Sequence, residues 1–168
     1  MESLSSLRIR PFTASDQQRV TEIEKTCSKV ITQVSSVLAF YEGALDGFIV
    51  AEVDGRVVGF LIGNLTILRD GSKAGHVLSI AVDPAFRGLG IGRALINYFA
   101  KNCRREAAGD LFLEVKKNNE SARRFYSHLG FKEIGIYPRY YRLRGYSEDA
   151  VLMSFELRTG RLRIGSAL

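Results

Sequence analysis

The stretch "VDPAFRGLGIGRALINYF", residues 82–99, decides the fold of this chain. Three glycines, Gly88, Gly90 and Gly92, lie between an apolar run and a segment whose apolar residues recur at helical spacing. Glycines between a strand and a helix often do no more than form a turn. Because each glycine also costs conformational entropy on folding, three of them so close together indicate that the exposed backbone itself has a function. Because backbone amides at a helix N-terminus bind anions, the stretch predicts a strand, a phosphate-binding loop and a helix.

Two common phosphate-binding motifs do not fit this loop. The nucleotide motif Gly-x-x-x-x-Gly-Lys-Ser/Thr is absent from the sequence, and the dinucleotide motif Gly-x-Gly-x-x-Gly would need its third glycine where Arg93 stands. Glu114 lies near the position of a ribose-binding acid, but the chain after it is too short for the rest of a doubly wound sheet. The pattern that fits is Arg-x-x-Gly-x-Gly, from Arg87 to Gly92.

Local signals predict further strands and helices on both sides of the loop. Thr13 and Asp16 have the spacing of a capping box, and Asp54-Gly55 lies between two β-branched runs as a tight hairpin turn. The segment "PRYYRLRGYSED", residues 138–149, is expected to be an aromatic and basic loop. The expected elements are strands over 7–12, 76–82, 111–115, 131–137 and 150–157, a hairpin over 46–68, and helices after Asp16, over 33–42, from the glycine loop to about Cys103 and over 119–130.

This order of elements predicts an α/β fold. The hairpin-rich first half and the parallel βαβ unit around the glycine loop indicate a mixed, mostly antiparallel sheet of about seven strands, with helices on both faces. A single domain over residues 1–158 fits the length of 168 residues, and residues 159–168 are expected to form a flexible tail.

Composition narrows the classes of function. Apolar and charged residues make up 46% and 25% of the chain, as in an ordinary globular protein, and no apolar run reaches the ~18 residues of a membrane helix. The N-terminus lacks a secretory signal pattern, and Cys27 and Cys103 match neither a metal spacing nor a disulfide framework. We therefore expect a cytoplasmic protein.

The net charge of +6 is concentrated in the second half of the chain. Residues 81–168 contain 16 Lys and Arg against 9 Asp and Glu, whereas residues 1–80 contain 8 against 9. A basic half indicates nucleic acid, a ribosomal surface or a polyanionic cofactor as a partner, and a simply solvated basic face is an equal alternative.

Several ordered segments resemble the GNAT acyltransferase superfamily, which binds acetyl-CoA with an Arg-x-x-Gly-x-Gly loop. They are the "IAVDP" strand before the loop, "LEVKKNNESARRFYSHLGF" (113–131) and "YPRYYR…EDAVLM" (137–153), and the likeness extends from Leu7 to Leu157. Within the superfamily they are most similar to protein N-terminal acetyltransferases, including the ribosomal-protein alanine acetyltransferase (RimI-like) group. The resemblance implies the GNAT fold and an N-acetyltransferase with acetyl-CoA as cosubstrate, a ternary complex and no metal.

The resemblance assigns the glycine loop and its flanks to acetyl-CoA. Asn119 would hydrogen-bond the cofactor, with a plain helix cap as an equal alternative. An amide in the strand before the loop would polarise the thioester carbonyl. The pantetheine arm would contact the backbone of Ile80, Ala81 and Val82, and the pyrophosphate would lie on the amides of Gly88, Leu89, Gly90, Ile91, Gly92 and Arg93, with Arg87 at the entrance.

The resemblance also implies the acid and the base of the reaction. Glu114 would be the general base, although the residues alone allow it to be only the outward position of an alternating strand. Tyr126 would protonate the leaving thiolate with a phenol near its usual pKa of about 10, although an aromatic at helical spacing is more often core. His76 and His128 are expected to be structural. Because Cys103 lies at a helix C-terminus, an acyl-cysteine route is not expected.

The acceptor is expected to be the N-terminus of a protein or peptide, with ribosomal proteins among the candidates and no specific nucleic acid or membrane partner. Tyr140 and Tyr141 would hold the first peptide residues, with hairpin packing as the alternative. An α-amine, with a pKa near 8, suits a single carboxylate base better than a lysine, with a pKa of about 10.4.

Other acceptors and functions stay open at this point. A small amine or a lysine ε-amine could be acetylated by the same machinery, and an idle CoA-binding or nucleic-acid-binding module is a further alternative. Residues 27–36, "CSKVITQVSS", lack the proline and aromatic residues that related enzymes often carry there. The preferred N-terminal residue of the substrate is therefore not predicted. The sequence also does not predict the oligomeric state.

Overall fold

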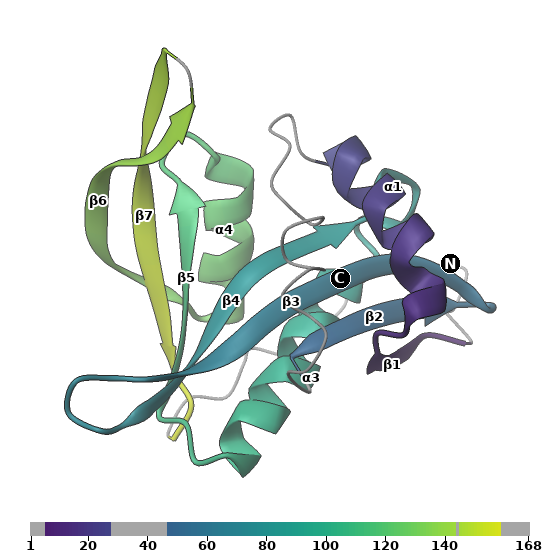
Figure 1. Cartoon of the computed structure of the whole chain (residues 1–168), viewed down its shortest axis with the longest axis horizontal. Coiled ribbons are helices and arrows are strands. Elements are labelled where there is room, and N and C mark those ends of the chain that lie inside the picture. Colours follow the sequence, from purple (N-terminus) through teal and green to yellow (C-terminus); the bar gives the residue numbers. More distant parts are fainter. Residues whose placement is uncertain (1–5, 28–46, 144, 159–168) are drawn as a thin grey trace. The chain divides into compact units, whose positions relative to one another are not determined.

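The computed structural model describes residues 6–27, 47–143 and 145–158 (Figure 1). The expected helix over 33–42 and the expected tail over 159–168 lie outside these residues. By its backbone contacts the chain divides into two compact units. The first unit consists of Met1–Asn64 and Ser79–Asn102, and the second of Leu65–Leu78 and Cys103–Leu168.

The strands of the described residues form a seven-stranded sheet in the order β1-β2-β3-β4-β5-β7-β6. The pairs β1–β2, β2–β3, β5–β7 and β6–β7 are antiparallel, and β4 and β5 are parallel. The predicted mixed, mostly antiparallel α/β sheet is thereby confirmed. The strands are β1 (Arg8–Pro11), β2 (Phe48–Val53), β3 (Arg56–Ile67), β4 (Lys73–Val82), β5 (Asp110–Lys116), β6 (Lys132–Leu143) and β7 (Tyr146–Glu156).

The helices of the described residues begin where the sequence signals place them. The predicted capping box between Thr13 and Asp16 is present, and α4 has Asn119 as its N-cap and Gly130, with φ of +104°, after its end. The α-helices are α1 (Gln17–Cys27), α3 (Ile91–Arg105) and α4 (Glu120–Leu129), and two short 3₁₀ helices are η1 (Ala14–Asp16) and η2 (Pro84–Phe86).

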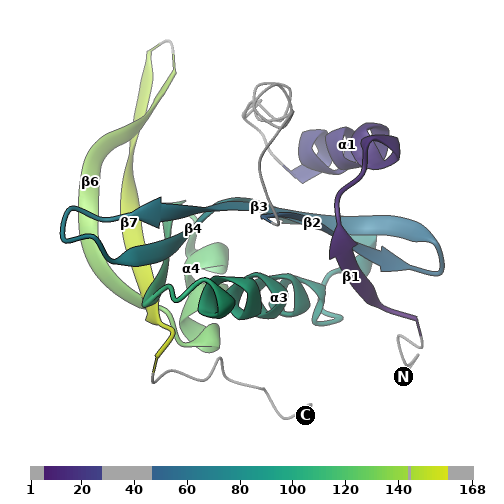
Figure 2. The same ribbon diagram turned by 60° about the horizontal axis from the view of Figure 1, so that its bottom comes forward.

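In the first unit, α1 and α3 lie on opposite sides of β2 and β3 (Figure 2). Alternate residues of a strand point to the same face of the sheet, and on the face toward α1 these residues are apolar. Together with residues of α1 they form one buried cluster. The cluster comprises Val20, Ile23, Phe48, Val50, Val57, Phe60 and Ile62. On the α3 side, Gly59 permits a close approach, since a Cβ there would lie 3.4 Å from Ile91 and 3.0 Å from the Ala81 carbonyl oxygen.

In the second unit, β5 alternates as predicted, with Leu111, Leu113 and Val115 buried and Glu114 on the opposite face. Aromatic rings from α4, β7 and the residue before β6 also pack against one another in this unit. The Phe131 ring centroid lies 5.7 Å from that of Tyr126 and 5.6 Å from that of Phe155.

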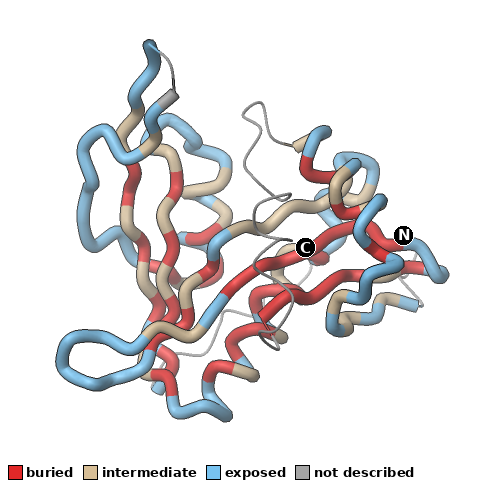
Figure 3. The backbone as a smooth tube through the Cα atoms, viewed as in Figure 1, coloured by how far each residue is buried: buried red, intermediate tan, exposed pale blue. Residues whose placement is uncertain are grey.

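The expected loop over 138–149 is wrong, because β6 and β7 extend through it as one long hairpin. Residues 132–140 of β6 are exposed, as the pale blue tube of Figure 3 shows. Between the paired residues Tyr137–Ala150 and Tyr141–Glu148, β6 contains two more residues than β7. Pro138 and Arg139, which has φ of +51°, lie in this bulge. An edge strand tolerates a proline and a bulge, so turn-like residues did not end it.

Candidate active site

The glycine loop connects η2 to α3 in the first unit. Gly88 and Gly90 have φ of +78° and +79°, a conformation that residues with side chains rarely adopt. Both face open space, since an added Cβ would meet no atom within 4 Å. The Ala94 amide donates to the Gly90 carbonyl oxygen at 3.0 Å, which starts the helical ladder, so the amides of residues 91–93 have no intrahelical acceptor. These features fit the predicted pyrophosphate cradle.

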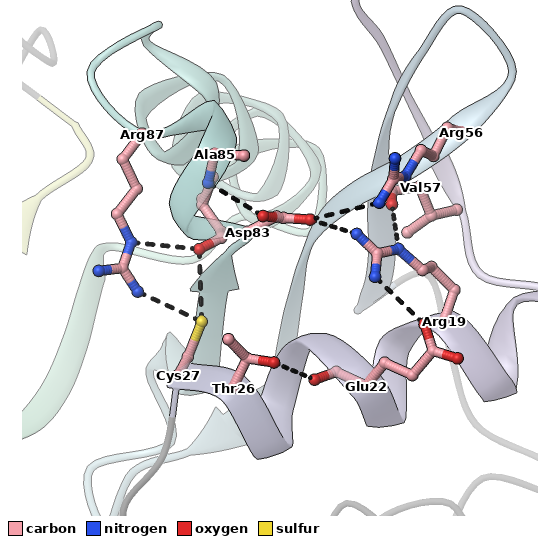
Figure 4. A network of polar contacts seen from close by, with 10 residues as sticks. Arg19, Glu22, Thr26, Cys27, Arg56, Val57, Asp83, Ala85 and Arg87 are labelled. Atoms are coloured by element: carbon pink, nitrogen blue, oxygen red, sulfur yellow. Dashed lines mark hydrogen bonds and ion pairs between the residues drawn. The ribbon is translucent and has the colours of Figure 1, made fainter.

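Two arginines flank the loop and differ in their contacts. Arg93 has a buried Nε atom with no hydrogen-bond partner among the described residues, a costly state that an anionic ligand would relieve. Arg87 donates through Nε to the Val82 carbonyl at 3.3 Å, and its Nη2 lies 3.3 Å from the Cys27 sulfur (Figure 4). To bind the pyrophosphate, Arg87 would therefore have to exchange these two contacts for contacts with the phosphate oxygens.

Asp83 fixes the end of the strand from which the loop departs. Its carboxylate accepts a hydrogen bond from the Ala85 amide at 3.0 Å and forms ion pairs with Arg19 and Arg56 (Figure 4). The Ala85 amide and the Arg19 guanidinium hold the pKa of Asp83 below its usual value. Arg19 also donates to the Val57 carbonyl, so α1, the β2–β3 hairpin and the loop entrance are linked. The sequence identified Asp83 only as the end of a strand.

Ile80, Ala81 and Val82 are the last three residues of β4 and are partly exposed. The parallel ladder between β4 and β5 covers only the pairs from Ala74–Asp110 to His76–Phe112, so these residues follow it. The Val82 carbonyl accepts from the Cys27 thiol at 3.3 Å as well as from Arg87.

Glu114 and His76 meet in the second unit. The Nε2 atom of His76 lies 2.6 Å from Oε2 of Glu114, and the two side chains are only 18% and 13% exposed. The imidazole also stacks on Phe112, with ring centroids 4.3 Å apart and planes 14° apart. From the sequence, His76 was expected to be structural, and its contact with Glu114 was not predicted. A βαβ unit makes its two strands neighbours, which is the signal that could have placed His76 beside β5.

The two tyrosines of the hairpin differ in burial. Tyr141 is partly buried, and its hydroxyl donates to the Glu114 carbonyl oxygen at 3.3 Å. Burial raises the pKa of Tyr141 to about 12, with Tyr140, Glu114 and Glu148 adding to the effect. Tyr140 is exposed, and its ring packs edge-on against Tyr141 at 5.0 Å between centroids. The structure thus brings the predicted peptide-binding residue Tyr141 into contact with Glu114.

Tyr126 is buried among aromatic rings on α4. Its ring lies edge-on to Phe125 and Phe131, at centroid distances of 5.2 and 5.7 Å. Burial, with a smaller effect of Tyr141, raises the pKa of Tyr126 above its usual value, in contrast to the ordinary pKa that we expected. The phenol is therefore protonated at neutral pH.

The remaining sequence candidates have ordinary local roles. The Asn119 side chain accepts from the Ala122 amide at 3.1 Å, as a helix cap does. His128 Nδ1 lies 2.7 Å from the Arg124 carbonyl oxygen within α4. Cys103 is buried, which raises the pKa of its thiol to about 12 and disfavours a thiolate nucleophile.

The described residues lack two further features. No three His, Cys, Asp or Glu side chains in this part of the chain gather into a group that could hold a metal ion. None of its helices combines the length and apolar character needed to cross a membrane.

Comparison with known proteins identifies the family. The sequence model of the Acetyltransferase (GNAT) family matches residues 14–131. The chain belongs to this family. As a GNAT protein it is 39% identical over 151 residues to an uncharacterized N-acetyltransferase of Methanocaldococcus jannaschii, covering 86% of this chain and 88% of that one. It is 42% identical over 125 residues to an N-alpha-acetyltransferase of Sulfurisphaera tokodaii, covering 70% and 71% of the two chains.

Further matches support both the fold and the likeness to N-terminal acetyltransferases. The crystal structure of Ard1 from Thermoplasma volcanium has a TM-score of 0.79 and 31% identity, covering 90% of this chain and 97% of that one. The ribosomal protein bS18-alanine N-acetyltransferase of Escherichia coli is 35% identical over 81 residues, 48% of this chain and 55% of that one. The predicted GNAT fold and N-acetyltransferase class, with acetyl-CoA as cosubstrate, are confirmed. The individual residue roles stay predictions.

Proposed function

We propose that this GNAT enzyme transfers the acetyl group of acetyl-CoA to the N-terminal α-amine of a protein or peptide. One observation carries the proposal: the Glu114 carboxylate is held by His76, and the Tyr141 hydroxyl binds the carbonyl of the same residue. The proposed base on β5 and the proposed peptide-binding tyrosine on β6 therefore lie close together, although β7 runs between these two strands. The name of the Sulfurisphaera relative, an N-alpha-acetyltransferase, gives independent support.

The glycine loop would bind the cosubstrate. Bare amides at the start of α3, open space at Gly88 and Gly90, and the unpaired Nε of Arg93 suit a diphosphate. Arg87 would give up its contacts with the Val82 carbonyl and the Cys27 sulfur in order to bind the diphosphate. The strand residues Ile80–Val82 would contact the pantetheine arm through their backbone.

The reaction then needs two proton transfers. The neutral amine nitrogen attacks the thioester carbonyl carbon, and a tetrahedral oxyanion forms, which a backbone amide of β4 stabilises. Glu114 takes the proton that the amine nitrogen loses, directly or through water. As the carbon–sulfur bond breaks, Tyr126 donates its hydroxyl proton to the sulfur, and CoA leaves as the thiol.

His76 acts in this scheme as a positioning residue. Its ring is fixed by stacking on Phe112, and its Nε2 atom holds one carboxylate oxygen of Glu114. The second carboxylate oxygen is thereby oriented for the amine proton. Because both side chains are largely buried, small shifts of the imidazole would move the base.

The experiment compares two peptides of matched sequence. One has a free N-terminus and no lysine, and the other has a blocked N-terminus and one lysine. We expect rapid acetylation of the first and slow acetylation of the second, measured by mass spectrometry with acetyl-CoA. Faster acetylation of the blocked lysine peptide would replace the proposal with lysine acetylation, and no acetylation of either peptide would favour a small amine as the acceptor. A set of first residues, including the alanine start of a ribosomal-protein substrate, would then define the preferred N-terminus.

A further inference from the structure

A lysine next to the candidate base lies between two tyrosine rings. Lys116 is two residues after Glu114 on β5, and side chains two apart in a strand share a face. Its Nζ atom lies 5.5 Å from the ring centroid of Tyr141 and 5.8 Å from that of Tyr146, within the range of a cation–π contact. The side chain is 31% exposed.

A nearly buried carboxylate completes this cluster. Glu148 Oε2 lies 4.0 Å from the Lys116 ammonium and accepts a hydrogen bond from the Tyr146 hydroxyl. Glu148 Oε1 accepts from the Asn118 amide at 3.3 Å. Only 9% of the Glu148 side chain is exposed, so its charge requires these partners. The proton transfers described above use neither Lys116 nor Glu148.

The cluster ends at the peptide-holding tyrosine. Glu148 is the direct cross-strand partner of Tyr141 in the β6–β7 register. Lys116 contacts the Tyr141 ring, while the Tyr141 hydroxyl binds the Glu114 carbonyl oxygen on the same strand as Lys116. Two contacts from β5 thus hold Tyr141, the Lys116 ammonium at the face of its ring and the Glu114 carbonyl oxygen at its hydroxyl. Glu148 on β7 also accepts a hydrogen bond from the Asn118 amide, in the loop that leads to α4.

We propose that Lys116 and Glu148 are positioning residues that hold Tyr141 beside Glu114 and thereby determine the affinity for the acceptor peptide. This inference rests on the proposed peptide-binding role of Tyr141. The two residues act through Tyr141, so they affect the KM of the acceptor and leave the KM of acetyl-CoA and the proton transfers largely unchanged. Tyr146 has a supporting role, since its hydroxyl orients the Glu148 carboxylate.

The test measures kcat and both KM values for a set of variants. Lys116→Met keeps the length of the side chain and removes the charge, and we expect it to raise the peptide KM roughly 5-fold or more with kcat and the acetyl-CoA KM within about 2-fold. Lys116→Arg keeps a cation over the rings, so its kcat and both of its KM values should stay close to those of the wild type. Lys117→Met is the matched control, because Lys117 pairs with Asp149 at 3.5 Å and is not among the residues of the cluster.

Two more variants distinguish a shared role from separate ones. Glu148→Gln should raise the peptide KM as Lys116→Met does. The double variant of Lys116→Met and Glu148→Gln should raise the peptide KM no more than the more affected single variant does. If a variant fails to fold, as judged by thermal unfolding, Tyr146→Phe removes only the hydroxyl bond to Glu148 and should still raise the peptide KM about 2-fold.

The outcomes separate this inference from the proposed function. An unchanged peptide KM in Lys116→Met, an equal rise in Lys117→Met, or an equal rise in the acetyl-CoA KM overturns the positioning role. A wild-type enzyme that acetylates only a lysine peptide overturns the N-terminal function instead, and the same variants measured with that acceptor then test the cluster separately.

Discussion

Nε2 of His76 and Oε2 of Glu114 are 2.6 Å apart, although the two residues are separated by 38 positions in the sequence. The contact arises because β4 and β5 are parallel neighbours whose paired residues run from Ala74–Asp110 to His76–Phe112. In a GNAT enzyme this places an imidazole against the residue that we propose as the base, and it makes the roles of the two side chains separable by mutation.

His76→Phe keeps a ring that can stack on Phe112 and removes the contact with Glu114. We expect kcat for peptide acetylation to fall roughly 10-fold or more, because the carboxylate is no longer oriented, with the acetyl-CoA KM little changed. Steady-state kinetics on the folded variant measure this. His128→Phe is the control, since His128 is exposed and its ring nitrogen Nδ1 bonds the Arg124 carbonyl oxygen within α4. Equal activity of the two variants would remove the positioning role of His76.

Glu114→Gln keeps the shape of the side chain and removes its ability to accept the amine proton. The expected loss in kcat is roughly 10²-fold or more at pH 7, as for other general bases. At higher pH the acceptor amine is already neutral, so the variant should regain part of its rate while the wild type changes less. A pH–rate profile that is parallel for the two proteins would contradict the assignment of the base.

Tyr126→Phe removes one hydroxyl and keeps the ring that packs against Phe125 and Phe131. We expect unchanged folding and a loss in kcat of about 10²-fold, because the thiolate loses its proton donor. Since burial raises the pKa of Tyr126, ionisation of this phenol should not lower kcat of the wild type up to about pH 10. Tyr98→Phe is the control, because Tyr98 is a partly buried tyrosine of α3 and is not one of the candidate site residues. Full activity of Tyr126→Phe would show that the role of Tyr126 is packing alone.

Gly90→Asp introduces both a side chain and a negative charge into the loop. Acetyl-CoA binding, measured by calorimetry, should be lost, because a carboxylate repels a pyrophosphate. Gly71→Asp controls for backbone strain, since Gly71 has φ of +81° against +79° for Gly90 and both positions face open space. If Gly90→Asp binds acetyl-CoA like the wild type, the loop is not the phosphate site.

Much of the fold could be predicted because its signals are local. The Asp54-Gly55 turn has φ of +50° and +78°, as a tight hairpin requires, and the Thr13–Asp16 box caps the first helix. The alternation around Glu114 was correct for the same reason. The extension of β6 and β7 was missed because an edge strand accepts Pro138 and a bulge, which sequence patterns associate with loops.

The candidate site was less predictable because its contacts join distant residues. The sequence identifies Glu114 and the glycine loop through their motifs, but the partner of Glu114 depends on the register between β4 and β5. The raised pKa of Tyr126 depends on burial, and the cluster around Lys116 depends on the extension of β6 and β7 through residues 138–149, which the sequence did not predict. Strand neighbours and burial are tertiary properties, and a single sequence carries only weak signals for them.

A competition within one molecule tests the choice of amine most directly. The substrate is a peptide with a free α-amine and one internal lysine, incubated with the wild-type enzyme and acetyl-CoA at pH 7, and tandem mass spectrometry locates the acetyl group. At this pH roughly 10% of the α-amine but only about 0.04% of the lysine is neutral, which favours the N-terminus for an enzyme with a single carboxylate base. We predict that early product carries the acetyl group on the α-amine and that Glu114→Gln forms this product roughly 10²-fold more slowly. Early product acetylated mainly on the lysine would contradict the proposed function.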